Sequence, residues 1–128
     1  MAGEYINDEV FDQGLDYFAG QTDIRVDITS QVATSYTEAI TTYTLGNKTG
    51  LTAGATADGG TDGRKVQIPA ITDGSVTGTD TATHWAVSDV SGTALIATGP
   101  LTSSQAVTSG NTFTLDAIDI TIRDATVT

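Results

Sequence analysis

The chain's only histidine, His84, stands directly before its only tryptophan, Trp85, and is the first candidate for chemistry. A histidine that works as a catalytic base needs a nucleophile to activate and an acid that orients its ring. Serine and threonine are plentiful, but there is no Gly-x-Ser-x-Gly elbow or other recognisable nucleophile context. The pattern favours a structural or surface histidine, and Trp85, with the largest apolar area, is expected to anchor a core or an interface.

Acidic residues alternate with glycine at residues 58–63 (Asp-Gly-Gly-Thr-Asp-Gly), and oxygen-rich loops of this kind can hold calcium. The Asp-x-Asp-x-Asp-Gly spacing with a later glutamate is missing, so a flexible turn is the better interpretation. Three further acids, Asp116, Asp119 and Asp124, are too widely spaced on a strand to form a convincing carboxylate pair. Residues 59–65 also lack the Gly-Lys-Ser/Thr ending of a phosphate-binding loop. We therefore expect no catalytic, cofactor-binding or metal-binding residues, and no enzyme.

The charge balance is strongly acidic, because 16 acids face 5 bases and give a net charge of −11. Such a surface repels phosphate backbones and anionic membranes, so we expect neither nucleic acid nor a membrane as a partner. The basic residues form no patch, being scattered at Arg25, Lys48, Arg64, Lys65 and Arg123. The charge then serves solubility or complementarity to a basic or neutral protein lattice.

The length of 128 residues predicts a single domain, residues 1–128. Cysteine is absent, which excludes a disulfide framework and a thiolate zinc site. The first residues lack the features of a secretory signal, and no apolar run approaches the roughly 18 residues of a transmembrane helix. We expect a soluble protein that is made in a cytoplasm.

One short α-helix is predicted over about residues 7–19. Asn7 can cap it and Gly20 can end it. An apolar stripe with helical spacing is formed by Phe11, Leu15 and Phe18. Gly14 costs such a helix about 1 kcal/mol relative to alanine, so the helix needs tertiary packing.

The rest of the chain favours strands, because threonine is the most abundant residue and is β-branched. Alternation predicts a half-buried strand over residues 24–28. Residues 35–43 fit a short helix or a turn that leads into a strand. Residues 46–63 are rich in glycine and predict a flexible surface loop or extended arm. Further strands are predicted at residues 65–68, ended by Pro69, and at residues 75–77 after an Asp73-Gly74 turn.

Residues 64–123 are expected to form a core of β-hairpins. Two strands, 84–88 and 93–98, are joined by a turn at residues 89–92, and Gly99-Pro100 ends the second. After a strand at 105–108 and a turn at 109–111, the longest strand begins at Thr112. Its apolar residues change from odd to even positions, which predicts a bulge or a sheet-switching corner near Asp116-Ala117. The strand spacing of about 8 to 12 residues predicts a single-domain antiparallel β-sandwich or small barrel with one N-terminal helix.

Short segments spread over most of the chain form a recognisable set: Asn7-Asp8-Glu9-Val10-Phe11-Asp12, Leu15-Asp16-Tyr17, Thr37-Glu38-Ala39, Tyr43-Thr44-Leu45-Gly46, Gly63-Arg64-Lys65-Val66, Thr83-His84-Trp85-Ala86 and the run from Gln105 to Leu115. Together they resemble small structural proteins of tailed bacteriophages. The resemblance implies a virion component. A small, acidic, cysteine-free β domain suits the outside of a shell, which points to a capsid decoration (cement) protein.

That expectation names the partners as the major capsid protein or other virion proteins, and the location as the virion. Placement at a local symmetry axis favours a trimer or a dimer. Two alternatives stay open. One is a neck, tail or fibre component of the same virion, and the other is a non-catalytic module that binds a receptor or a carbohydrate.

Overall fold

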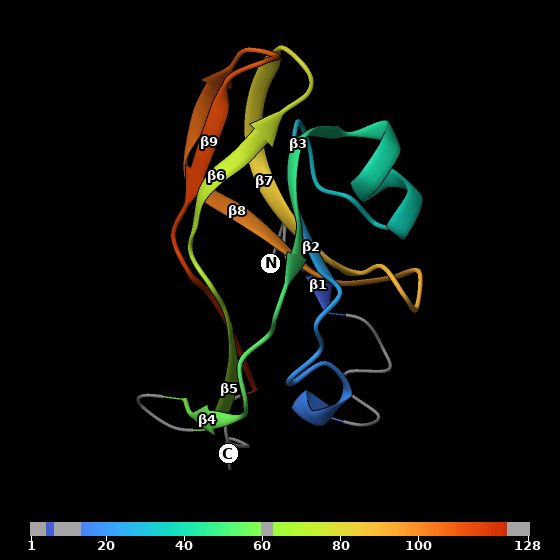
Figure 1. Cartoon of the computed structure of the whole chain (residues 1–128), viewed down its shortest axis with the longest axis vertical. Coiled ribbons are helices and arrows are strands. Elements are labelled where there is room, and N and C mark those ends of the chain that lie inside the picture. Colours follow the sequence, from blue (N-terminus) through green and yellow to red (C-terminus); the bar gives the residue numbers. More distant parts are fainter. Residues whose placement is uncertain (1–4, 7–13, 60–62, 123–128) are drawn as a thin grey trace, which may run out of the picture.

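The computed structural model describes residues 5–6, 14–59 and 63–122, which form one small, mainly β domain (Figure 1). A seven-stranded antiparallel sheet has the order β1-β8-β7-β2-β3-β6-β9, and a three-stranded sheet has the order β10-β5-β4. The strands are β1 (Tyr5–Ile6), β2 (Ile24–Thr29), β3 (Thr44–Leu51), β4 (Ala57–Asp58), β5 (Arg64–Ile68), β6 (Ile71–Val76), β7 (Asp80–Asp89), β8 (Ala94–Val107), β9 (Thr112–Leu115) and β10 (Ile118–Ile122). The larger sheet curls into a half-barrel, so the predicted mainly β, antiparallel, single-domain fold is confirmed.

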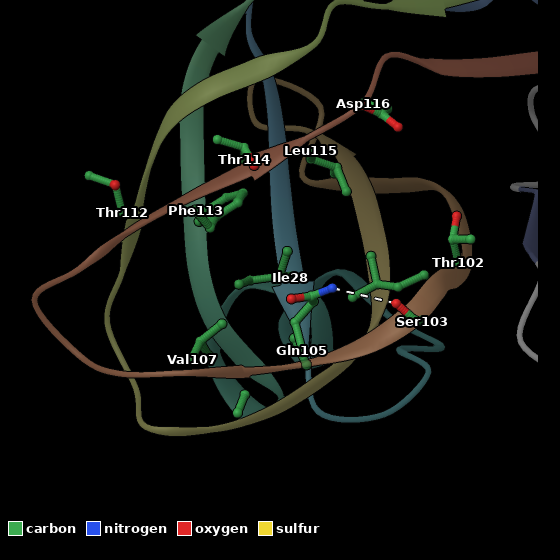
Figure 2. A pocket seen from close by; sticks show the side chains of 13 residues that line it. Ile28, Thr102, Ser103, Gln105, Val107, Thr112, Phe113, Thr114, Leu115 and Asp116 are labelled. Carbon is green, nitrogen blue, oxygen red and sulfur yellow. Dashed lines mark hydrogen bonds between the residues drawn. The ribbon is translucent and has the colours of Figure 1, made fainter.

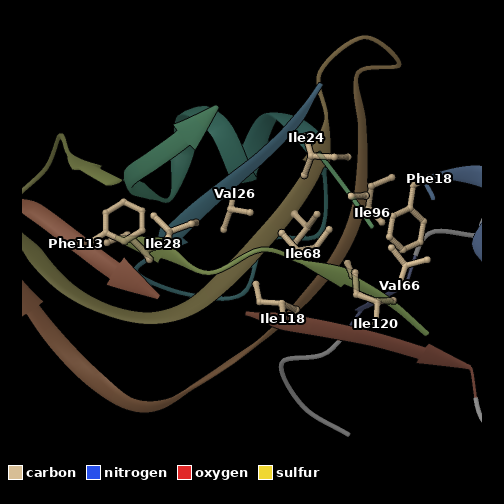
Figure 3. Close-up of a cluster of buried hydrophobic side chains, with 14 of the residues drawn as sticks. Phe18, Ile24, Val26, Ile28, Val66, Ile68, Ile96, Phe113, Ile118 and Ile120 are labelled. Carbon is tan, nitrogen blue, oxygen red and sulfur yellow. The ribbon is translucent and has the colours of Figure 1, made fainter. Parts of the chain in front are cut away.

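The main core lies where the concave side of the large sheet meets β5 and β10 (Figure 3). Strand β2, at the centre of the large sheet, points Ile24, Val26 and Ile28 into this core, as its period-two pattern predicts. Side chains from the small sheet and the segment before β2 meet them, and they include Phe18, Val66, Ile68, Ile118 and Ile120.

The corner predicted near Asp116-Ala117 is confirmed. Strand β9 pairs with β6 in the large sheet, whereas β10, which begins at Ile118, pairs with β5 in the small sheet. The change of apolar parity accompanies this change of sheet, because Phe113 and Ile118 are both buried although one is odd and the other even.

Strand β2 is buried on both faces, whereas its alternation predicted one exposed face. Its second face is covered by a small cluster that includes Ala33, Ala39 and Leu95, with the π-helical turn η2 (Glu38–Thr42) packed beside it. This turn leads into β3, so the predicted short helix or turn before a strand is confirmed.

The N-terminal α-helix predicted for residues 7–19 is wrong for the part that is described. Residues 7–13 lie outside the described residues, and residues 14–17 form a 3₁₀ turn, η1 (Gly14–Tyr17). Gly14 has φ +68°, a left-handed conformation that cannot continue a right-handed helix. Leu15 and Phe18 are nevertheless buried, as the apolar stripe predicted.

The loop predicted for residues 46–63 is wrong over much of its length. Strand β3 extends to Leu51, and β4 occupies two later residues. Gly46 lies so close to the β6 backbone that a Cβ atom would stand 2.5 Å from the Ser75 carbonyl oxygen. Ala53 is also buried, and its N–H donates to the Gln21 carbonyl (2.9 Å). Part of the predicted loop is therefore core structure.

Two predicted breaks lie inside strands. Gly74, expected in a turn, is in β6, where a Cβ atom would meet the Phe113 ring at 2.3 Å. Gly99, expected to end a strand, lies inside β8, where a Cβ atom would meet the Trp85 ring at 2.5 Å. At each position a different aromatic ring packs against the glycine, which explains the small residue, and neither glycine lies in a turn. The hairpin turn between β7 and β8 is confirmed.

Candidate functional site

A groove of about 420 Å³ lies between the end of β8 and β9 (Figure 2). These two strands are neighbours in sequence but are not paired with each other. Their separation is the opening of the half-barrel. The groove is lined by Ile28, Ala82, Leu101, Thr102, Ser103, Gln105, Ala106, Val107, Thr112, Phe113, Thr114, Leu115 and Asp116.

The groove has an apolar floor and a polar rim. Ile28, Ala82 and Phe113 are buried members of the main core and form the floor. The rim is made of exposed residues that donate or accept hydrogen bonds, namely Thr102, Ser103, Gln105, Thr112, Thr114 and Asp116. Within the rim, Gln105 Nε2 donates a long hydrogen bond to Ser103 Oγ (3.5 Å; Figure 2).

Both strands at the groove have an unpaired edge within the described part of the chain. β1 pairs with β8 only at Ala97 and Thr98, so β8 continues beyond its outer neighbour. β9 pairs with β6 alone. An unpaired edge exposes a row of N–H and C=O groups to which another extended segment can bond.

The direction of the free groups on β9 follows from one hydrogen bond. The Val76 N–H donates to the Asn111 carbonyl at 2.9 Å, so the carbonyl of the residue just before β9 faces β6. Backbone groups of successive strand residues point to opposite sides. The N–H and C=O groups of Thr112 and Thr114 therefore point away from β6, towards the open edge.

A second, shallower hollow of about 270 Å³ adjoins the groove and shares Leu101, Thr102, Leu115 and Asp116 with it. Trp85 lines this hollow and is half-buried against the main core. Trp85 was expected to anchor a core or an interface, and its packing against the core agrees with the first of these. The exposed part of the ring extends the apolar surface beyond the groove floor.

The structure places His84 away from any described acidic partner. Its Nδ1 lies 2.8 Å from Thr83 Oγ1, and that hydroxyl also lies 3.0 Å from the Ser30 carbonyl oxygen. The hydroxyl can donate to the carbonyl or to the ring. The Thr83 hydroxyl thereby links β7 to the segment that follows β2.

The acids singled out in the sequence are not brought together. Asp58 pairs with Arg64 on the surface (3.0 Å), and residues 60–62 and 124 lie outside the described residues. Asp119 accepts hydrogen bonds from Gln67 (2.9 Å) and Lys65 (3.2 Å), which lower its pKa. Asp116 is exposed at the groove. Among the residues that the structure describes, no three acids or histidines gather where they could hold a metal ion.

An ion pair that the sequence analysis missed lies under η2. Asp27 is fully buried and accepts two hydrogen bonds from Arg25 (2.8 and 2.9 Å) and one from Thr44 Oγ1 (2.6 Å). Burial raises the pKa of Asp27, while the bonds from Arg25 and Thr44 oppose that rise. Arg25 also reaches the Ile40 carbonyl at 3.4 Å, which ties η2 to β2. Residues 25 and 27 share one face of a strand, so their pairing is local, but the burial of the pair depends on η2.

In comparisons with known proteins, no family model, curated protein or solved structure matches the chain. Across the described residues, no helix is long and apolar enough to cross a membrane. The groove therefore has to be interpreted from its own geometry.

Proposed function

We propose that the protein is a virion structural protein that binds the outer surface of a tailed-phage head and stabilises it as a decoration protein. The observation that carries this proposal is the open groove between β8 and β9, an apolar floor with a polar rim and unpaired strand edges. A surface of this kind is suited to binding an extended protein segment. The resemblance to phage structural proteins supports the choice of partner.

Decoration stabilises a shell by binding alone. A ligand that binds only the assembled state stabilises that state by mass action. Its molecules must stay soluble until they reach the shell. A net charge of −11 favours solubility, since the charged, solvent-facing surface stays hydrated.

The test is the composition and heat stability of the particle. Cryo-electron microscopy and quantitative mass spectrometry of purified virions should find hundreds of copies on the head. Particles that lack the protein should release their DNA at a lower temperature, and adding the purified protein back should restore the resistance. A particle without density for this chain on its head would overturn the proposal. Six or twelve copies would instead indicate the neck or tail.

A further inference from the structure

We infer that the groove receives one extended segment of a partner protein, which adds to β9 as the next strand of the large sheet. The inference rests on the proposed function for the existence of a protein partner and goes further by naming the chemistry of the bound segment. That segment presents apolar side chains on one face and at least one basic residue. The bound segment would fill the gap between β9 and the end of β8.

The backbone of β9 supplies the first reason. Thr112 and Thr114 direct their N–H and C=O groups away from β6, as the bond between Val76 and Asn111 requires. These groups match the hydrogen-bonding pattern of an added strand. Strand addition at a free edge is a general mode of peptide recognition, in which the main chain supplies affinity.

The side chains around the groove supply the second reason. Alternate residues of an added strand face the same side of the sheet. The side chains of one set would contact the apolar floor at Ile28 and Phe113 and would lie beside Leu115. The other set would face solvent, beside exposed Thr114. A volume of about 420 Å³ fits a few side chains of an extended segment and is too small for a folded element.

Charge selects the kind of partner. The lining residues of the groove include Asp116 and, among those described, neither lysine nor arginine. A second copy of this chain would bring a further net charge of −11 against the same edge. Repulsion between like charges disfavours that pairing, whereas a basic residue of a partner could form an ion pair with the Asp116 carboxylate. The occupant is therefore a different, locally basic chain.

The closing experiment uses a displayed pool of random ten-residue peptides, selected on the whole protein. We expect enrichment of sequences in which apolar residues alternate with polar ones and include lysine or arginine. The affinity of an enriched peptide is then measured by fluorescence anisotropy for wild type, Thr114→Pro and Thr114→Val. Proline removes the N–H of residue 114, which does not bond to β6, and proline is tolerated in an edge strand. Valine is the control, because it keeps this N–H and removes only the side-chain hydroxyl.

Thr114→Pro should weaken binding at least tenfold, while Thr114→Val should stay within twofold of wild type. If Thr114→Pro does not fold, N-methyl groups on alternate residues of the peptide provide the same test from the partner's side. One set of positions should abolish binding and the other should not. No enrichment on wild type, or equal binding by the folded proline and valine variants, overturns the inference. Self-association of wild type through this edge, seen by analytical ultracentrifugation, also overturns it.

Particle binding separates this inference from the proposed function. If wild type and both variants cosediment equally with heads, the protein decorates the shell but does not use the β9 edge. If wild type ignores heads yet binds peptides in a manner sensitive to Thr114→Pro, the groove takes a strand and the virion role fails. If Thr114→Pro loses head binding while wild type and Thr114→Val keep it, the result supports both the virion role and the binding of a strand at β9.

Discussion

Replacing Arg25 by methionine should destabilise the fold strongly at neutral pH, because it leaves the buried Asp27 carboxylate without its cation. The side chain of Asp27 is fully buried and that of Arg25 is 19% exposed, so neither charge is well solvated. Breaking a buried ion pair on one side costs about 3 to 5 kcal/mol. Thr44 still donates to the carboxylate at 2.6 Å, so we expect the lower end, about 3 kcal/mol.

The assay is urea unfolding followed by the fluorescence of Trp85 and by circular dichroism. With a slope of about 1.5 kcal/mol per molar urea, the midpoint should fall by about 2 M. Lys48→Met is the matched control. Lys48 pairs with Asp73 on the surface (3.0 Å), and exposed pairs of this kind contribute about 0 to 1 kcal/mol.

The loss should also depend on pH. Without Arg25, the pKa of Asp27 rises further above that of the unfolded chain, so the folded variant binds a proton that the unfolded chain does not. Stability then increases as the pH falls through the folded pKa, and the deficit relative to wild type shrinks from pH 7 towards about pH 4. A deficit below about 1 kcal/mol at pH 7, or one unchanged on acidification, would refute the reasoning.

The remaining predictions concern packing and acid stability. Gly74→Ala should cost about 1 to 3 kcal/mol, because its Cβ would overlap the Phe113 ring, while exposed Ser75→Ala should change the melting temperature little. Equal melting temperatures for the two variants would contradict this packing. Asp119 has a pKa lowered chiefly by Gln67, so it stabilises the fold above about pH 4 and loses that effect as the pH falls. Below that pH, the urea midpoint of Asp119→Asn should therefore fall less steeply with decreasing pH than that of wild type. Equal slopes for the two proteins would contradict the prediction.

The corner between β9 and β10 could be predicted because its signal is local. Phe113 and Ile118 lie five residues apart, and their parity conflicts within one strand, so the sequence alone requires a change of face. The period-two strand at Ile24 was predictable for the same reason. Both predictions depend only on the residues of the segment itself.

The groove and the buried ion pair could not be predicted, because both depend on segments that are distant in sequence. Thr112 and Thr114 resemble the exposed residues of any strand until β8 is placed across from them. Asp27 resembles a solvent-facing residue until η2 covers it. Gly74 follows an aspartate, a pair typical of turns, and only the Phe113 ring explains why it lies in a strand.

The position of β2 between β3 and β7 has a consequence for how the chain folds during synthesis. Ile28 on β2 is paired with Trp85 on β7, so one edge of this apolar strand stays bare until nearly 60 further residues have been made. Sheets dominated by such distant pairing fold slowly, in milliseconds to seconds. Until β7 arrives, the nascent chain presents an unpaired hydrophobic edge that chaperones or other nascent chains can bind.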